Sequence, residues 1–315
     1  MNKYAVPACP TFPFADPLSS HLFRDELTGD IVIVAPGRRY RPDTVSQHKV
    51  KDPLALKHLA QEKILAVYGK GKHRMLAIEN AFPVFHSDRE LKGRQEMLVE
   101  GTEVRPFSDF TAGQMASALD ALRERSKIFR RDPTLKYMVV FKNEGKEAGA
   151  SLLHPHSQIF GLCFVPERLR RLSRNLKTAR HSHTSPHVRA LTEATKDRII
   201  YADKLAVAFA DPYSRFAYGV RILPRRCLDN ITQTTPAERK SLAKALYALM
   251  PLVRQHELSY NFHFHDVFSD EHEVFEIKFA PRANIWAGFE LDAGIVINPV
   301  PAECAAYEYR QARKT

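Results

Sequence analysis

Apolar residues along the chain follow two spacings, and each spacing predicts a different kind of element. Short runs rich in Val, Ile, Phe and Tyr predict strands. These runs cover residues 31–34, 75–78, 94–100, 137–141, 204–209, 218–223, 260–265 and 274–279. At 111–129 and 236–256 the apolar residues recur every three or four positions, which predicts amphipathic helices. A shorter helix is expected within 53–66.

Turn and capping residues support several of these elements. Thr28 and Gly29 stand before the first strand and indicate a hairpin. Thr235, Pro236 and Glu238 form a capping box with proline at the first helical position, so a helix should begin there. The order strand, helix, strand, strand then occurs twice along the chain. The pattern therefore predicts an α+β protein with two similar halves.

The composition is that of an ordinary globular protein, with 315 residues, 44% of them hydrophobic, and 13 glycines. A formal net charge of +11 favours anionic partners such as nucleotides, sugar phosphates or nucleic acid. The basic clusters do not form one stripe with stacking aromatics, so no nucleic-acid-binding module is predicted. Nucleic acid is accordingly not favoured as a partner.

Neither a membrane segment nor a disulfide framework is expected. No apolar run approaches the roughly 20 residues of a membrane helix, and the amino terminus lacks the layout of a signal peptide. The four cysteines, Cys9, Cys163, Cys227 and Cys304, lie far apart and include no Cys-x-x-Cys pair. They fit reduced structural thiols, so a cytoplasmic protein without membrane partners is predicted.

The segment from 142 to 160 carries the strongest chemical signal. His154, His156 and Gln158 alternate along a run with apolar flanks, so in a strand their side chains would share one face. Pro155 withholds a ladder donor, which predicts a strand at a sheet edge or one that opens onto a cleft.

Glycines and small residues precede the two histidines. Gly145 and Gly149, with small residues at 148, 150 and 151, allow the backbone to approach a ligand as phosphate-binding loops do. An imidazole after such a loop suits attack on phosphorus. Two histidines at this spacing also fit half of a zinc site or a simple packing role. The residues alone leave these three alternatives open.

An ordered signature runs through this segment: Asn143-x-Gly145, then Ala148-Gly149-Ala150-Ser151, then His154-Pro155-His156-Ser157-Gln158. It resembles the active-site signature of the galactose-1-phosphate uridylyltransferase family, a branch of the histidine-triad superfamily. Gln158 stands where the hydrolase branches have a third histidine, as in the transferase branch. The resemblance implies a tandem pair of histidine-triad-like units, each a mostly antiparallel sheet with flanking helices. The first, 1–195, would carry the nucleophile; the second, 196–315, would be catalytically degenerate and supply a segment that contacts sugar and phosphate.

The same resemblance implies roles within the signature. His156 would attack the α-phosphorus of a nucleoside-diphosphate sugar and form a covalent nucleotidyl-histidine, from which a sugar 1-phosphate accepts the nucleotide. Gln158 would hold a non-bridging phosphate oxygen, and His154 would complete the catalytic set. The phosphates would contact four loop residues, Asn143, Gly145, Gly149 and Ser151.

Further matches to the family lie outside the signature. A Leu-Thr-Gly turn leads to Arg38-x-x-Arg41-Pro, which resembles a segment whose arginines reach the nucleotide phosphates of the partner subunit. Asn80 and Phe82 match residues that contact the nucleoside. The resemblance thus implies a homodimer with shared active sites that binds a nucleotide sugar and a sugar phosphate.

Phe289 and Glu290 match the sugar-contacting segment near the carboxy terminus of the family. Residues 284–285 and 292–293 depart from the family pattern, so the identity of the sugar is not predicted. A phosphorylase of a nucleoside-diphosphate sugar or dinucleoside polyphosphate would use the same covalent intermediate. A nucleotide-binding protein without activity is the alternative from another class.

The metal positions of the family pattern are not kept. Residues 43–75 contain no cysteine, where the family has a zinc-binding pair, and Val104 stands in place of a histidine. Of four zinc positions only His154 remains, so no zinc cofactor is expected. In the second half, Val274 and Glu276 replace histidines of a second metal site.

Three further histidines, His181, His183 and His187, fall in the basic and polar stretch 168–196. The stretch lacks acidic partners and a regular apolar pattern. It is therefore expected to be a solvated linker rather than a metal site.

Overall fold

The structure is a computed structural model that describes residues 21–24, 31–34, 52–59, 64–85, 92–180, 186–268 and 274–314. Two short strands near the amino terminus, β1 (His21–Arg24) and β2 (Ile31–Val34), pair antiparallel. Their pairing confirms the expected hairpin, although its turn at Thr28 and Gly29 lies outside the described residues.

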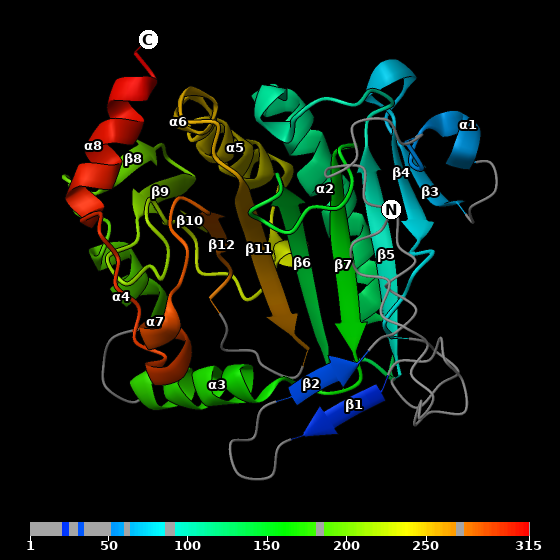
Figure 1. Cartoon of the computed structure of the whole chain (residues 1–315), viewed down its shortest axis with the longest axis horizontal. Coiled ribbons are helices and arrows are strands. Elements are labelled where there is room, and N and C mark those ends of the chain that lie inside the picture. Colours follow the sequence, from blue (N-terminus) through cyan, green and yellow to red (C-terminus); the bar gives the residue numbers. More distant parts are fainter. Residues whose placement is uncertain are drawn as a thin grey trace.

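Ten strands form one antiparallel sheet in the order β3-β4-β5-β7-β6-β11-β12-β10-β9-β8 (Figure 1). The strands of the first half are β3 (Ile64–Tyr68), β4 (Met75–Glu79), β5 (Gly93–Glu100), β6 (Tyr137–Glu144) and β7 (His156–Leu162). Those of the second half are β8 (Ile199–Ala202), β9 (Ala206–Ala210), β10 (Val220–Pro224), β11 (Tyr260–Val267) and β12 (Ile277–Pro281). The predicted strands beyond residue 70 are confirmed, and β3 and β8 add the two edges.

The two halves of the sheet have the same strand order when each is counted outward from their junction. There β6 pairs with β11 from Tyr137 opposite Val267 to Glu144 opposite Tyr260. Outward from the junction, β7, β5, β4 and β3 follow on one side, and β12, β10, β9 and β8 follow on the other. The expected boundary between residues 195 and 196 falls before β8, and it stays a prediction because the sheet itself is continuous.

One face of the sheet is covered by helices that pack on its main hydrophobic core. They are α2 (Ala112–Arg130), α5 (Pro236–Tyr247), α6 (Met250–Gln255) and α8 (Ala302–Ala312). The predicted cap at Thr235 forms, because its side chain accepts from the backbone N–H three residues on, and Thr111 caps α2 in the same way. The helix expected over 236–256 is broken, since Pro251 cannot donate to the preceding turn and its ring crowds it.

The opposite face carries α1 (Leu56–Leu59), α3 (Glu167–Arg180) and α4 (Pro186–Thr192). The two later helices correct the expectation of a solvated linker over 168–196. Leu169 of α3 packs with Phe85, Tyr137 and Leu162, and this burial of leucines at helical spacing stabilises a helix among many charges. A further short helix, α7 (Gly288–Ala293), precedes α8.

His187 is buried at the start of α4, where its Nε2 lies 2.9 Å from the carbonyl oxygen of Arg225. It is therefore a structural side chain, whereas His181 and His183 lie outside the described residues. The short helix expected within 53–66 is limited to α1, and β3 follows it.

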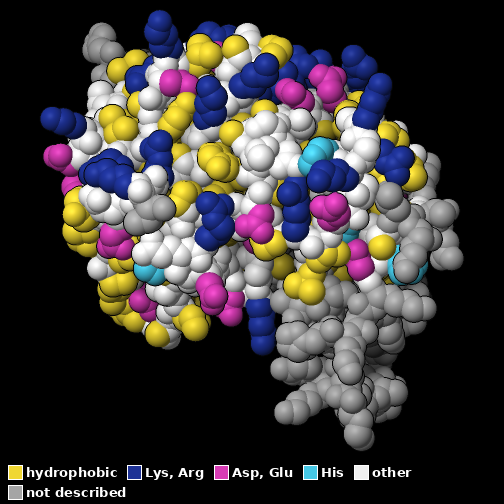
Figure 2. All heavy atoms as spheres, turned by 90° about the horizontal axis from the view of Figure 1, so that it is seen from above, with side chains coloured by type: hydrophobic (Ala, Val, Ile, Leu, Met, Phe, Trp, Pro, Cys, Tyr) yellow, Lys and Arg dark blue, Asp and Glu magenta, His cyan; other side chains and the backbone are white. Residues whose placement is uncertain are grey.

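On the face seen in Figure 2, Lys and Arg side chains lie singly or in small groups with acidic side chains between them. The excess of positive charge is thus spread over this face and does not form a stripe. Across the described residues, none of the helices has the length and apolar character needed to cross a membrane.

Candidate functional site

The loop between β6 and β7 is shaped by glycine. Gly145 has a φ of +83°, and a Cβ there would lie only 2.2 Å from the Ser259 hydroxyl. A residue with a side chain would therefore be both strained and crowded. The loop turns back through a hydrogen bond from the Ala150 N–H to the Gly145 carbonyl, 3.1 Å long. This turn brings Ser151 toward the start of β7.

His156 is the first residue of β7 and is 4% exposed. Its Nδ1 lies 2.9 Å from the backbone carbonyl oxygen of His154, which can only accept. Nδ1 therefore carries the proton in the neutral ring, and Nε2 carries the lone pair. This tautomer is the one that an imidazole nucleophile requires.

A narrow cavity of about 70 Å³, here called the catalytic cavity, brings five of the predicted site residues together. It is lined by the expected Asn80, Phe82, Ser151, His156 and Gln158, and by Pro53, Leu54, Ile78, Glu79, Ala81, Met97 and Leu152. Residues more than 70 positions apart thus meet at one site. The volume is below that of usual ligand pockets, so a nucleotide would extend beyond it.

The strand that carries His156 is not at an edge, because β7 lies between β5 and β6. The edge prediction is wrong for a simple reason: Pro155 lies just before β7, where its missing N–H interrupts no ladder. Its carbonyl still accepts from the Glu100 N–H at 2.9 Å. The alternative expectation, a strand that opens onto a cleft, is the one observed.

His154 does not share the face of His156 and Gln158, because it precedes the strand. Its Nδ1 lies 2.8 Å from Asp52 Oδ2, and its Nε2 lies 3.1 Å from the Gly101 carbonyl oxygen. Burial alone would raise the pKa of Asp52, but the hydrogen bond and charge of His154 outweigh it and lower that pKa below its ordinary value. His154 is therefore held at both ring nitrogens.

The residues around His154 do not fit a zinc ion. Both of its ring nitrogens face oxygen acceptors, and zinc needs four ligands, usually Cys or His. Within the described ranges, no three His, Cys, Asp or Glu side chains are grouped so that they could hold a metal. The absence of a zinc cofactor remains a prediction.

A buried ion pair supports the backbone at His156, and sequence reasoning missed it. Lys142 Nζ lies 2.6 Å from Glu100 Oε2 and donates to the carbonyl of His156 at 2.9 Å. Ser157 Oγ donates to the other Glu100 oxygen at 2.6 Å. Because both charges are fully buried, removing one partner would leave the other uncompensated. The only local signal was a lysine that continues an apolar strand.

The predicted phosphate-binding residues divide between two cavities. Asn143 and Gly145 line a larger cavity of about 450 Å³, here called the acidic cavity, together with His154. Asn143 also accepts from the side-chain amide of Asn261 at 2.9 Å. Gly149 has a φ of +77° and open space where a Cβ would stand.

The predicted sugar-contacting residues lie on α7, away from both cavities. Phe289 is 54% exposed, and Glu290 accepts from the Ala287 N–H at 3.0 Å. Neither lines the catalytic cavity within the described chain. Arg38 and Arg41 lie outside the described residues, so their expected role is not placed here.

In the second half, a cavity of about 270 Å³ lies beside β10 and β12. Glu276 is one of the residues predicted to stand in place of a histidine. It binds the Arg221 guanidinium at 2.6 Å and the Lys278 ammonium at 3.1 Å. Burial would raise the pKa of Glu276, but these two cations lower it. A position that the family pattern gives to a histidine is thus taken by an ion-paired carboxylate in this half.

The continuous sheet of two repeated halves and the His-Pro-His-x-Gln segment together define a galactose-1-phosphate uridylyltransferase-like protein. Residues 110–306 match the family described as a domain of unknown function, DUF4921, and the chain belongs to that family.

Relatives with named activities extend over most of the chain. This chain is 25% identical over 315 residues to a galactose-1-phosphate uridylyltransferase of Thermotoga maritima, and the match covers 90% of this chain and 96% of the relative. A solved uridylyltransferase mutant superposes with a TM-score of 0.77 at 23% identity, covering 93% of this chain and 97% of that one. An ADP-glucose phosphorylase from Arabidopsis thaliana, solved with ADP-glucose bound, has a TM-score of 0.74 at 22% identity and covers 93% and 99%. These comparisons confirm the predicted resemblance, and the relatives are uridylyltransferases and phosphorylases.

Proposed function

We propose that this protein is a nucleotidyltransferase of the galactose-1-phosphate uridylyltransferase type. It would move a nucleoside monophosphate between a nucleoside-diphosphate sugar and a sugar 1-phosphate through a covalent nucleotidyl-His156. The observation that carries the proposal is the 2.9 Å contact between His156 Nδ1 and the His154 carbonyl oxygen. His156 lines the same cavity as Gln158 and Ser151. It gives the ring the tautomer that attacks through Nε2.

In the first step, Nε2 of His156 attacks the α-phosphorus, and the bond from that phosphorus to the bridging oxygen breaks. The sugar 1-phosphate leaves as an anion and needs no proton. The ring becomes positively charged, and its Nδ1–H donates more strongly to the His154 carbonyl. Gln158 holds a non-bridging oxygen as the geometry at phosphorus inverts.

In the second step, a phosphate oxygen of the acceptor attacks the same phosphorus and the N–P bond breaks. His156 returns to its neutral form, so the cycle needs no net proton transfer. The Lys142–Glu100 pair keeps the His156 backbone in place between the two steps, since Lys142 donates to the His156 carbonyl.

Labelling with nucleoside-diphosphate sugars that carry ³²P at the α-position tests this proposal. We expect acid-labile, alkali-stable label on the wild-type protein and none on His156→Ala. The matched control is His187→Ala, because His187 is also buried and bound to a backbone carbonyl but lies outside the site. Equal labelling of His156→Ala and the control would refute the mechanism.

The second candidate is a phosphorylase, favoured by the relative that is named an ADP-glucose phosphorylase. It shares the first step, and inorganic phosphate then accepts the nucleotide. Labelled protein mixed separately with inorganic phosphate and with sugar 1-phosphates distinguishes the two acceptors. A protein that binds nucleotide without activity would bind the nucleotide sugar yet acquire no label.

We further propose that the protein is a homodimer in which each subunit completes the site of the other. We also propose that it acts in the cytoplasm and needs no zinc. The sugar-contacting candidates stand on an exposed apolar segment within the described chain: Ile285 is 91% exposed and Leu291 71%. Such exposure favours an interface. Nucleic acid is not proposed as a partner.

Mixing two inactive variants tests the shared site. His156→Ala and Glu290→Ala would each be inactive as homodimers, but a mixed dimer contains one intact site. Because half of randomly mixed dimers are heterodimers, about a quarter of wild-type activity is expected after unfolding and refolding together. No recovery in the mixture would show that the sites are not shared.

A further inference from the structure

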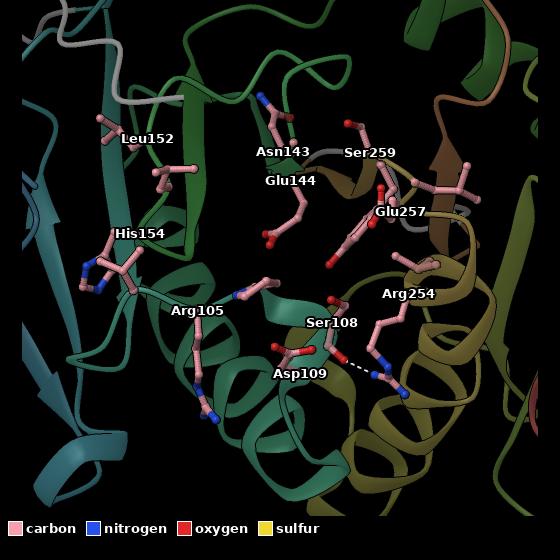
Figure 3. A pocket seen from close by; sticks show the side chains of 17 residues that line it. Arg105, Ser108, Asp109, Asn143, Glu144, Leu152, His154, Arg254, Glu257 and Ser259 are labelled. Carbon is pink, nitrogen blue, oxygen red and sulfur yellow. Dashed lines mark hydrogen bonds between the residues drawn. The ribbon is translucent and has the colours of Figure 1, made fainter. Parts of the chain in front are cut away.

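The acidic cavity lies beside the loop that precedes His156, yet neither His156 nor Gln158 lines it. Its walls come from the segment after β5, the end of β6, and the connection from α6 to β11 (Figure 3). Leu152 lines both this cavity and the catalytic one. A volume of about 450 Å³ is in the range of small-molecule sites.

The wall of the acidic cavity contains a polar group that lacks a partner. Tyr260 is fully buried, and its hydroxyl is inaccessible and makes no hydrogen bond. Burial, followed by the charges of Glu144, Glu100 and Asp109, raises the pKa of Tyr260 well above its ordinary value. The phenol therefore keeps its proton and needs an acceptor. A buried hydroxyl without an acceptor is unfavourable, because it has lost its hydrogen bonds to water.

Several carboxylates line the same cavity as Tyr260. Figure 3 shows Glu144 and Asp109 directed into the cavity from opposite sides, with the Glu257 side chain beside them. Glu144 accepts from the Phe107 N–H at 3.0 Å. Burial raises its pKa more than the nearby Lys142 lowers it.

The two arginines of the cavity already contact other groups of the protein. The Arg105 guanidinium points away from the centre in Figure 3 and lies 4.5 Å from the centroid of the Phe110 ring. Arg254 donates to the Ser108 carbonyl. The cavity therefore presents mainly acceptors, which disfavours nucleotides, sugar phosphates and other anions.

We propose that the acidic cavity binds an uncharged polyol of monosaccharide size, separately from the nucleotide. Ligand hydroxyls would donate to the carboxylates of Glu144 and Asp109, and one would accept from the Tyr260 hydroxyl. An ammonium group has no lone pair to accept from that phenol, and an anionic acceptor would be repelled by the carboxylates. A hydroxyl group both donates and accepts, and a polyol offers several of them, so it satisfies the whole set.

Binding there would also contact the segment that leads to the nucleophile, since Asn143 and Gly145 line the cavity. The inference goes beyond the proposed transfer reaction and does not need it. A protein that forms no nucleotidyl-histidine could still bind a polyol here.

Ligand-observed NMR and calorimetry on the full chain test this site with neutral hexoses, pentoses and inositol, and with glucose 1-phosphate for comparison. We expect at least one neutral polyol to bind at millimolar concentration or tighter, without displacement by a nucleoside-diphosphate sugar. Tyr260→Phe should weaken its binding by about 10-fold or more, because the buried hydroxyl that has no acceptor in the protein can no longer donate to the ligand. The variant should still be labelled at His156.

The matched control is Tyr309→Phe, because Tyr309 is also fully buried but its hydroxyl donates to the Tyr218 carbonyl at 3.0 Å. It should bind the polyol as the wild type does. Tyr260→Phe should unfold at the same temperature as the wild type or higher, whereas Tyr309→Phe should unfold lower. Failure of every polyol to bind the wild type, or equal binding by Tyr260→Phe, would overturn the proposal.

Discussion

Replacing Asp52 with alanine removes a link between the wall of the catalytic cavity and the nucleophile. Asp52 Oδ1 accepts from the Leu54 N–H at 3.0 Å, and Leu54 lines the cavity. The other oxygen holds His154 Nδ1 at 2.8 Å. The carbonyl of His154 in turn fixes the ring of His156 at 2.9 Å. The change therefore loosens both the pocket and the imidazole that attacks.

The size of the effect follows from burial. His154 has a fully buried side chain and Asp52 one that is 24% exposed, so their contact is only partly screened by solvent. A hydrogen bond to a charged group contributes about 1.5–3 kcal/mol, and the bond to the Leu54 N–H about 1 kcal/mol. Because the partial exposure of Asp52 weakens the charged contact, we expect the free energy of unfolding to fall by about 2–3 kcal/mol, toward the lower end of their sum. Looser orientation of His156 should slow nucleotidylation by about tenfold.

Calorimetry and single-turnover labelling measure the two effects in the same preparation. The control is Asp132→Ala, because Asp132 caps a turn by accepting from the Thr134 N–H at 3.0 Å and lies outside the catalytic cavity. It should lose less stability and keep the wild-type labelling rate. If Asp52→Ala became unstable but labelled at the control rate, the link from Asp52 to the nucleophile would be refuted.

Three further changes have distinct expected outcomes. Gln158→Ala should slow single-turnover labelling by about 10²-fold while the affinity for the nucleotide sugar changes little; an unchanged rate would contradict its contact with phosphate oxygens. Arg125→Met should lower the free energy of unfolding by about 3 kcal/mol in denaturant melts, because Arg125 holds buried Glu96 at 2.7 Å through two nitrogens and only Arg94 would remain. Burial lowers the pKa of His263 from 6.5 to about 4, so the unfolded chain binds a proton first and stability falls as pH decreases from about 6.5 to 4. His263→Gln should reduce by about 2 kcal/mol the loss of stability between pH 7 and 4.5, and identical pH profiles for the two proteins would contradict this.

The strands could be predicted because both faces of the central sheet are buried. Val140 and Ile159 face the main core, while Val139 and Phe160 pack in a second cluster on the other face. Consecutive positions are therefore apolar, and the runs stand out in the sequence. The helix α2 was equally visible in its apolar spacing, and the cap at Thr111 supports it in the structure.

Elements whose stability comes from distant contacts could not be predicted. The sequence of α3 is dominated by Arg and Lys. Its few leucines stabilise a helix only because they pack against β6 and β7, which the local sequence does not show. The break before α6 was marked in the sequence by Pro251, a signal that the apolar spacing concealed.

In the site, too, residues that are close in the sequence could be predicted together and distant contacts could not. Signature and spacing placed His156, Gln158 and Ser151 together, because they lie within one loop and the strand that follows it. The partner of His154 is Asp52, about a hundred residues earlier, and no local pattern joins them. The expectation of a shared face failed since the strand begins only at His156.

Peptide mass spectrometry of the protein trapped with a nucleoside-diphosphate sugar tests the covalent step most directly. We expect one nucleoside monophosphate adduct on the peptide that contains His156, lost when sugar 1-phosphate or inorganic phosphate is added. Attachment at another residue, or turnover by His156→Ala at a rate comparable to the wild type, would contradict the mechanism.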